Sequence, residues 1–219
     1  MDLLTPKVLN AWLLDTFFPR RCVGCGVEGE WLCLLCTEGA ANAHGETMLF
    51  ELPSGLPVVS LLRYEVPVVR ELLHYLKYDS ITEAAESLIG IFTGSLAAHT
   101  LNRLVPNDAT LLPVPLSGKR LRRRGYNQAE VLAMCVQPLL RIESAPPYLT
   151  RSNQHSQVGQ SREQRRTALK NTFVLTSDPG TKTVVLFDDV CTTGATLEAA
   201  AEPLLRAGIN VLGMTVARA

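Results

Sequence analysis

Long apolar runs are missing from this sequence, and no stretch approaches the roughly 20 residues that a membrane-spanning helix needs. An excess of one charge is missing as well, because 21 basic residues balance 21 acidic ones. Net charge therefore predicts no polyanionic partner, and any nucleic-acid binding has to come from a local basic patch. Repeats and low-complexity tracts are also absent, and 47% hydrophobic and 19% charged residues are typical of a globular protein.

Two missing motifs exclude further classes of protein. The chain starts with an early acid, Asp2, and has no basic segment ahead of an unbroken apolar core, so we expect no secretory signal. Residues 1–18 instead have the pattern of a short amphipathic helix. We expect a cytoplasmic protein, in which cysteines serve metal binding or catalysis more often than disulfides. The absence of G-x-x-x-x-G-K-[ST] excludes the phosphate loop of nucleoside triphosphatases.

Strand-like and helix-like segments alternate along most of the chain. Strands are expected at 57–64, 110–115, 147–149, 183–190 and 210–219. Helices are expected at 67–76, 81–92, 128–140 and 194–207. Pro203 lies inside the last of these and predicts a kink or an earlier end. The alternation predicts an α/β fold with an open, mostly parallel sheet flanked by helices.

The N-terminal part holds four of the six cysteines, Cys22, Cys25, Cys33 and Cys36. They form two C-x2-C pairs, seven residues apart, which can supply four thiolates to a tetrahedral metal site. We expect a structural zinc knuckle, since four thiolates leave no open coordination position. An iron–sulfur cluster takes the same ligands and stays an alternative.

The same stretch spells G-x-G-x-x-G at Gly24, Gly26 and Gly29. No apolar strand precedes it and we expect no helix after it, so we interpret these residues as turn glycines of the knuckle. Residues 41–57 are polar, with glycine and proline, and suit a linker. We therefore predict two units, an N-terminal helix with the knuckle at 1–45 and an α/β domain at 57–219.

The most informative segment is VVLFDDVCTTGATL, residues 184–197. An apolar run ends in Asp188 and Asp189, and a small, hydroxyl-rich turn leads into a helix. Ligands of open α/β sheets bind at the carboxyl ends of strands, and a helix N-terminus favours a phosphate. Two carboxylates beside such a turn fit a ligand with hydroxyl groups, or a metal held jointly with the ligand. A phosphorylated sugar supplies both the phosphate for the turn and the hydroxyl groups for the carboxylates.

Two basic segments accompany this turn. Lys119, Arg120 and the arginines at 122–124 follow the predicted strand at 110–115, and they form either a pyrophosphate site or a solvated basic loop that could contact nucleic acid. Residues 150–166 are polar and begin with Arg151. They form either a mobile lid over the site or a surface loop, and His155 within them is either an acid–base group or plain surface.

The segment at 184–197 resembles the phosphoribosyl-diphosphate signature of type I phosphoribosyltransferases. The resemblance implies that Asp188 and Asp189 contact ribose hydroxyls, and that Mg²⁺ is bound with the phosphoribosyl diphosphate. It implies that the turn holds the 5′-phosphate, through Val190, Cys191, Thr192, Thr193, Gly194, Ala195 and Thr196. The diphosphate loop is implied at Leu116, Ser117, Gly118, Lys119 and Arg120. We assign the catalytic roles to Asp188, Asp189 and Arg151.

The order of motifs over roughly residues 17–219 is similar to that of the ComF family of bacterial competence proteins. It runs FP-x2-C-x2-C, LC-x2-C, LLHYLKY, PVPL, RGYNQA and LFDDVCTTGAT. The resemblance implies handling of incoming single-stranded DNA in the cytoplasm during natural transformation, with a competence helicase and a recombination mediator as partners. Apolar helices also make a homo-oligomer an expectation.

Three functions follow as hypotheses. The first is a ComF-like DNA-uptake protein that binds phosphoribosyl diphosphate and single-stranded DNA. The second is an active phosphoribosyltransferase that transfers 5-phosphoribose to a nitrogen nucleophile. The third is a regulator or scaffold that senses the sugar phosphate without turnover. The sequence contains no recognisable acceptor pocket with which to choose among them.

Overall fold

A computed structural model describes residues 19–44, 47–95, 98–152 and 172–219 of the chain. The helix predicted at 1–18 lies outside these ranges, as does most of the 150–166 stretch with His155. No helix in the described part is long and apolar enough to cross a bilayer.

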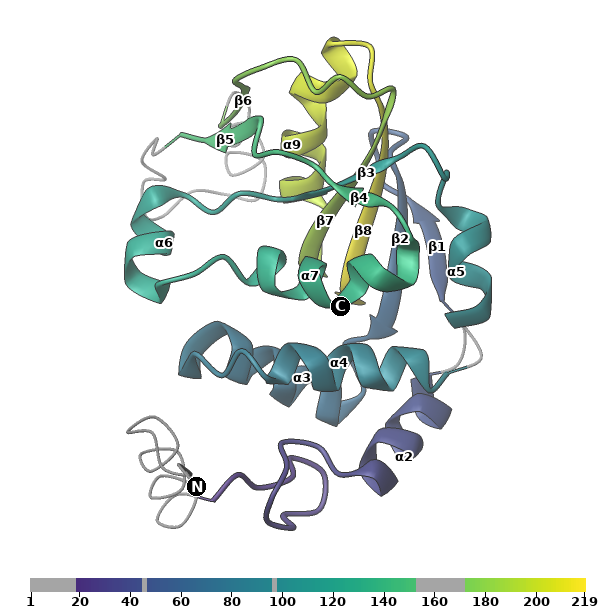
Figure 1. Ribbon diagram of the computed structural model, residues 1–219, viewed down its shortest axis with the longest axis vertical. Helices are drawn as coiled ribbons and strands as arrows, with labels where there is room; N and C mark the ends of the chain where they lie inside the picture. Colours follow the sequence, from purple (N-terminus) through teal and green to yellow (C-terminus); the bar gives the residue numbers. More distant parts are fainter. Residues whose placement is uncertain (1–18, 45–46, 96–97, 153–171) are drawn as a thin grey trace, which may run out of the picture.

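The architecture is a six-stranded sheet with helices on both faces (Figure 1). The strand order is β1-β2-β8-β7-β3-β4, and every neighbouring pair is parallel except β1 with β2. The strands are β1 Met48–Glu51, β2 Pro57–Arg63, β3 Thr110–Pro113, β4 Glu143–Ser144, β7 Thr183–Cys191 and β8 Asn210–Arg218. Two short strands, β5 Leu149–Arg151 and β6 Phe173–Leu175, form a separate antiparallel pair. The predicted α/β fold with a mostly parallel sheet is confirmed.

The sheet divides the core into two layers, and helices cover each of them. The helices are α2 Leu34–His44, α3 Pro67–His74, α4 Ala84–Thr93, α5 Ala98–Leu104, α6 Gly118–Arg124, α7 Gln128–Leu140 and α9 Ala195–Arg206, with a π-helix, η1 Tyr75–Asp79, continuing α3. Val185 and Phe187 of β7 join the core cluster under α3, α4 and α7, whereas Val184 and Leu186 join the cluster under α9. Alternate residues of a strand point to opposite faces, so a central strand covered on both sides needs four consecutive apolar residues.

The knuckle packs on this core. Cys22 and Leu32 are buried in the same cluster as α3 and α4, together with Ala40 and Ala41 of α2. The Trp31 ring also meets the Tyr75 ring edge-on, at 5.5 Å between centroids. The N-terminal cysteine segment is therefore joined to the helical layer by apolar contacts. The division into units at 1–45 and 57–219 stays a prediction.

Three sequence predictions are corrected here. The linker at 41–57 is wrong, since α2 extends to His44 and β1 pairs with β2. Pro203 was expected to kink the last helix or to end it early, and the early end is wrong, because α9 continues to Arg206. A proline removes one backbone hydrogen bond from a helix. Pro203 lies in the last turn of α9, where the burial of Leu204 outweighs this loss. A helix does follow the knuckle glycines, but Gly26 and Gly29 have φ of 78° and 116°, as tight turns require.

Candidate functional site

The two acids at the end of β7 have different surroundings. Asp189 is buried, and its Oδ2 accepts a hydrogen bond from Gln128 Nε2 at 2.9 Å. The same oxygen pairs with Lys77 Nζ at 3.2 Å, while Oδ1 accepts the Val190 N–H at 2.6 Å. Asp189 is thus held on the side of α7 and η1, where a strand places every second residue.

Asp188 faces an open cleft and is only partly buried. Burial raises the pKa of Asp188 to about 7, and the neighbouring charge of Asp189 adds to the rise. The Asp189 N–H donates to Asp188 Oδ1 at 2.8 Å, and this hydrogen bond lowers the pKa of Asp188. The charges of Lys77 and Arg151 lower it as well. Near neutral pH this carboxyl is therefore ready either to hold a proton or to meet a cation or a hydroxyl.

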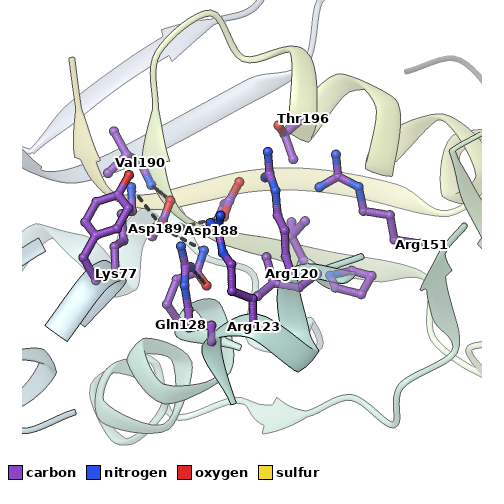
Figure 2. Close-up of a pocket in the computed structure, with 14 residues that line it drawn as sticks. Lys77, Arg120, Arg123, Gln128, Arg151, Asp188, Asp189, Val190 and Thr196 are labelled. Carbon is purple, nitrogen blue, oxygen red and sulfur yellow. Dashed lines mark hydrogen bonds and ion pairs between the residues drawn. The ribbon is translucent and has the colours of Figure 1, made fainter. Parts of the chain in front are cut away.

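The cleft has a volume of about 250 Å³ and is rich in cations (Figure 2). Its charged and amide-bearing lining consists of Lys77, Arg120, Arg123, Arg124, Gln128, Arg151, Asp188 and Asp189. Figure 2 shows Arg120 and Arg151 on one side of Asp188, with Lys77 and Asp189 on the other. Burial lowers the pKa of Arg151, and its guanidinium lies 5.0 Å from the Phe173 ring centroid. Four arginines around one small cleft create a site for a polyanion.

The turn after β7 is formed as a phosphate loop would be. Gly194 has φ of 76°, and a Cβ at this position would collide with the Leu52 side chain, so only glycine fits. The loop encloses a hollow of about 30 Å³, bounded by Asp188 and by residues 190–197. The Ala195 N–H reaches Thr193 Oγ1 at 3.4 Å, and the first-turn amides of α9 lack partners within the helix. Such amides favour an anion.

The structure brings most of the predicted site residues together. Asp188, Asp189, Val190, Thr196, Leu116, Arg120 and Arg151 line the cleft, and Cys191, Thr192, Thr193, Gly194 and Ala195 line the adjoining hollow. Ser117, Gly118 and Lys119 do not line either one. The loop expected there is instead the start of α6, with Ser117 as its N-cap. A helix turns only some of its side chains to one side, so Arg120 faces the cleft and Lys119 does not.

Lys77, Tyr78 and Gln128 are among the site residues that the sequence prediction missed. Lys77 and Tyr78 belong to η1 and line the cleft beside the acids, whereas Gln128 is the first residue of α7. The Tyr126 hydroxyl donates to the Leu76 carbonyl, which ties η1 to the RGYNQA segment. The LLHYLKY motif was the available signal, but helical periodicity does not distinguish a π-turn from an α-turn. π-Helical turns occur frequently at functional sites.

The four knuckle sulfurs form a compact cluster within 4.8 Å of one another. Cys25 Sγ and Cys33 Sγ are 3.6 Å apart, close to the roughly 3.8 Å expected for two ligands on one tetrahedral zinc. A Cβ on Gly24 would lie 2.6 Å from Cys36 Sγ, so glycine is required for the turn to close. The residues present therefore fit a metal ion with four thiolate ligands.

Backbone groups prepare one of these thiols for metal binding. Burial alone would raise the pKa of Cys22, but backbone N–H groups of the knuckle, including Cys33 N at 3.4 Å from Cys22 Sγ, bring it down to about 6. The neighbouring Cys33 sulfur raises the pKa of Cys36 to about 12. A cation placed among the four sulfurs would offset the repulsion between neighbouring thiolates and so favour their deprotonation.

Comparison with known proteins shows the family to which the chain belongs. Residues 98–217 match the family model described as the phosphoribosyl transferase domain. The DNA utilization protein YhgH of Escherichia coli O157:H7 is 30% identical over 182 residues, which cover 81% of this chain and 79% of that protein. Competence protein F of Haemophilus influenzae is 37% identical over 104 residues, or 46% of this chain and 45% of that one.

Among solved structures, orotate phosphoribosyltransferase from Aeropyrum pernix is 18% identical, with a TM-score of 0.34 over 84% of this chain and 79% of that one. The type I phosphoribosyltransferase-like fold expected from the sequence is confirmed by the family match. With the matched domain, these relatives and the four-cysteine cluster, the chain belongs to the ComF family of phosphoribosyl transferase domain proteins.

Proposed function

We propose that the cleft binds 5-phosphoribosyl-1-diphosphate in a protein that acts in DNA uptake or use. One observation carries the proposal: at the end of β7 a phosphate-type loop and an arginine cluster flank the partly buried Asp188. A ligand with a phosphate at one end, a diphosphate at the other and hydroxyls between them matches this order of groups.

Each part of the ligand has partners in this arrangement. The 5′-phosphate would lie on the loop 192–196, and the ribose hydroxyls would meet Asp188. The diphosphate would point toward Arg120, Arg123 and Arg151, on the other side of the cleft. Carboxylate and phosphate oxygens are the ligands that Mg²⁺ prefers, so Asp188 is the residue to hold it with the diphosphate. Bound magnesium would neutralise part of the diphosphate charge.

Calorimetric titration with phosphoribosyl diphosphate and Mg²⁺ tests this assignment. Replacing both acids, Asp188→Ala/Asp189→Ala, is expected to weaken binding at least about tenfold, because 1.4 kcal/mol of lost interaction already has that effect. The exposed Asp108→Ala variant serves as the control, since this residue lies outside the cleft. Equal affinity in the wild type and the double variant would contradict the site.

DNA binding is the second part of the proposal. The relatives are named for DNA utilization and competence, and α6 exposes Lys119 and Arg122 outside the cleft lining. We propose that single-stranded DNA lies along this basic helix, with a competence helicase and a recombination mediator as protein partners. Self-association through apolar helix faces stays a prediction. A salt series with a fluorescent oligonucleotide tests the contact: affinity should fall as salt rises, and no binding at low salt removes this part.

An active phosphoribosyltransferase is the second candidate, and the arginine cluster favours it. A nitrogen nucleophile would bond to the anomeric carbon as the bond to the diphosphate breaks. The leaving diphosphate would meet Arg120 and Arg151, which lowers the cost of its developing charge. Pyrophosphate release in the presence of adenine or uracil would support turnover. Binding of phosphoribosyl diphosphate without release would favour a sensor or scaffold instead.

A further inference from the structure

The turn between β1 and β2 packs against the phosphate loop at 192–196, although the two are far apart in sequence. A Cβ on Gly194 would collide with the Leu52 side chain, so Leu52 fills the space beside this glycine. The Ser54 N–H donates to Glu198 Oε1 at 2.9 Å and joins the same turn to the first helical turn of α9. We propose that Glu198 is a positioning residue, which holds the phosphate loop in shape through this contact with the hairpin.

The turn that carries Ser54 is anchored in the core. The Leu52 N–H donates to the Leu56 carbonyl at 2.9 Å, and the Gly55 N–H donates to the Leu52 carbonyl at 2.8 Å. Leu52 and Leu56 are both buried, and they belong to the core cluster under α9. The Ser54 amide is therefore presented to Glu198 by a turn whose own hydrogen bonds and apolar side chains fix its shape.

Glu198 lies where an acid has two opposing effects. A carboxylate in the first turn stabilises the N-terminus of a helix, but it also repels an anion bound to the same amides. The charge of Glu198 reaches the loop: burial raises the pKa of the Cys191 thiol, the charge of Arg218 lowers it, and the charge of Glu198 raises it further. The hollow of the loop is nevertheless bounded by Asp188 and residues 190–197, and Glu198 lies outside it. The hydrogen bond from Ser54 keeps the carboxylate on the hairpin side and leaves the loop to an anion.

The hairpin is a contribution of the N-terminal half of the chain to the loop. Strand β1 and the turn at 52–56 precede the residues 98–217 that match the phosphoribosyl transferase domain. The inference rests on the proposed function for the identity of the anion, a sugar phosphate at the loop. The contact between Ser54 and Glu198 is present without a ligand, so its effect on the loop can be measured separately.

Two substitutions of Glu198 separate positioning from charge. Glu198→Gln removes the charge but keeps a carbonyl oxygen that can accept the Ser54 N–H, whereas Glu198→Ala removes both. A role through charge alone would make both variants bind ribose 5-phosphate more tightly, and to the same extent. We expect Glu198→Gln to bind this probe at least as tightly as the wild type. Glu198→Ala should bind it about fivefold more weakly, because the hydrogen bond that positions the loop is lost.

Calorimetric titration of the full chain measures these affinities. Pyrophosphate is the second probe, since it tests the arginine side of the cleft, and its affinity should be the same in the wild type and both Glu198 variants. Glu202→Ala is the matched control, because Glu202 lies one turn further along α9 and pairs with Arg206 instead of the hairpin. Equal ribose 5-phosphate affinities in Glu198→Ala and Glu198→Gln overturn the proposal. An equal loss in Glu202→Ala, or a parallel loss of pyrophosphate affinity in Glu198→Ala, overturns it as well.

Hydrogen exchange of the ligand-free protein separates this inference from the proposed function. In Glu198→Ala the segments 52–56 and 192–200 should exchange at least about threefold faster than in the wild type, whereas Glu198→Gln should exchange as the wild type does. This difference, combined with no ribose 5-phosphate binding by the wild type, supports the positioning role and removes the proposed function. Sugar-phosphate binding by the wild type, combined with identical exchange in the two variants, removes the inference alone.

Discussion

Asp188 and Asp189 are neighbours in sequence, yet they do different work in the folded chain. Asp189 is fully occupied by Lys77, Gln128 and the Val190 N–H, which together satisfy both of its oxygens. Asp188 has only the Asp189 N–H among its hydrogen-bond donors in the described part of the chain, and it opens on the cleft. Asp188 is thus the acid that is free to meet a ligand, while Asp189 positions η1 against β7.

The raised pKa of Asp188 predicts a pH-dependent gain in stability for Asp188→Asn. In the unfolded chain this carboxyl ionises near its usual pKa of 3.8, whereas in the folded chain it ionises near 7. The wild type therefore loses stability as pH rises from about 4 to 7 and stays at the lower value above 7. The asparagine variant avoids this loss, so its Tm advantage should be small at pH 4 and largest at pH 8.

Thermal unfolding at several pH values measures this difference. Each kcal/mol recovered should raise Tm by about 2–4 °C for a chain of this size. Asp108→Asn, an exposed aspartate outside the cleft, is the control and should follow the wild type. A Tm advantage of Asp188→Asn that is the same from pH 4 to pH 8 would contradict the raised pKa.

Lys77→Met should weaken binding of phosphoribosyl diphosphate by about tenfold. Lys77 is 23% exposed, lines the cleft and offsets the charge of Asp189, so its removal leaves that charge uncompensated beside a polyanion. It also removes a cation that lowers the pKa of Asp188, and that carboxyl should then hold its proton to higher pH. Calorimetry at pH 7.5 measures the change. Lys119→Met, on the exposed face of α6, is the comparison, and an equal effect in both would exclude a specific role for Lys77.

At the scale of elements, helix α6 presents two faces with different surroundings. Arg120 and Arg123 line the cleft, whereas Arg122 is exposed and lies outside it. Arg123→Gln should reduce the affinity for inorganic pyrophosphate about three- to tenfold, because a charge-assisted contact is lost. Arg122→Gln should leave pyrophosphate affinity unchanged while weakening binding of single-stranded DNA. Parallel titrations of both variants test the two faces, and identical losses would show that α6 acts only as a diffuse basic patch.

Elements with strong local signals were predicted closely. Helix α7 has the predicted bounds of 128–140, because Asn127 caps Ala129 N and the apolar stripe is regular. Helix α6 was missed, since it has seven residues, starts at a glycine and has no buried side chain. Strand β1 was missed because it has only four residues and is stabilised by pairing with β2. Local sequence preference does not reveal such a pairing.

At the scale of the whole molecule, the knuckle should act as a structural part of the fold. Cys22 and Leu32 of the knuckle belong to the same hydrophobic cluster as α3 and α4. The Trp31 ring contacts Tyr75 at the start of η1. Removing zinc with a chelator should therefore lower the Tm of the main unfolding transition, on the order of 10 °C for a tightly bound ion. Zinc content and a thermal scan measure this together.

Cys36→Ser should reproduce the effect of the chelator, and adding the chelator to this variant should change little. Cys135→Ser is the control, because Cys135 belongs to α7 and is remote from the knuckle in sequence. If the chelated protein unfolds at the same temperature as the zinc-loaded one, the knuckle is not part of the cooperative core.

The chemistry of the cleft was readable in the order of residues along the chain. An apolar run, two acids and a threonine-glycine turn are contiguous, so the strand, the acids at its end and the turn that follows them are determined by local geometry. The four thiolates were readable for the same reason, because their spacing is local. Lys77, Tyr78 and Arg151 reached the cleft through folding, since they come from separate elements that the parallel sheet gathers at one edge. Folding also separated the roles of Asp188 and Asp189, because the strand turns adjacent side chains to opposite faces and only one face carries Lys77 and Gln128.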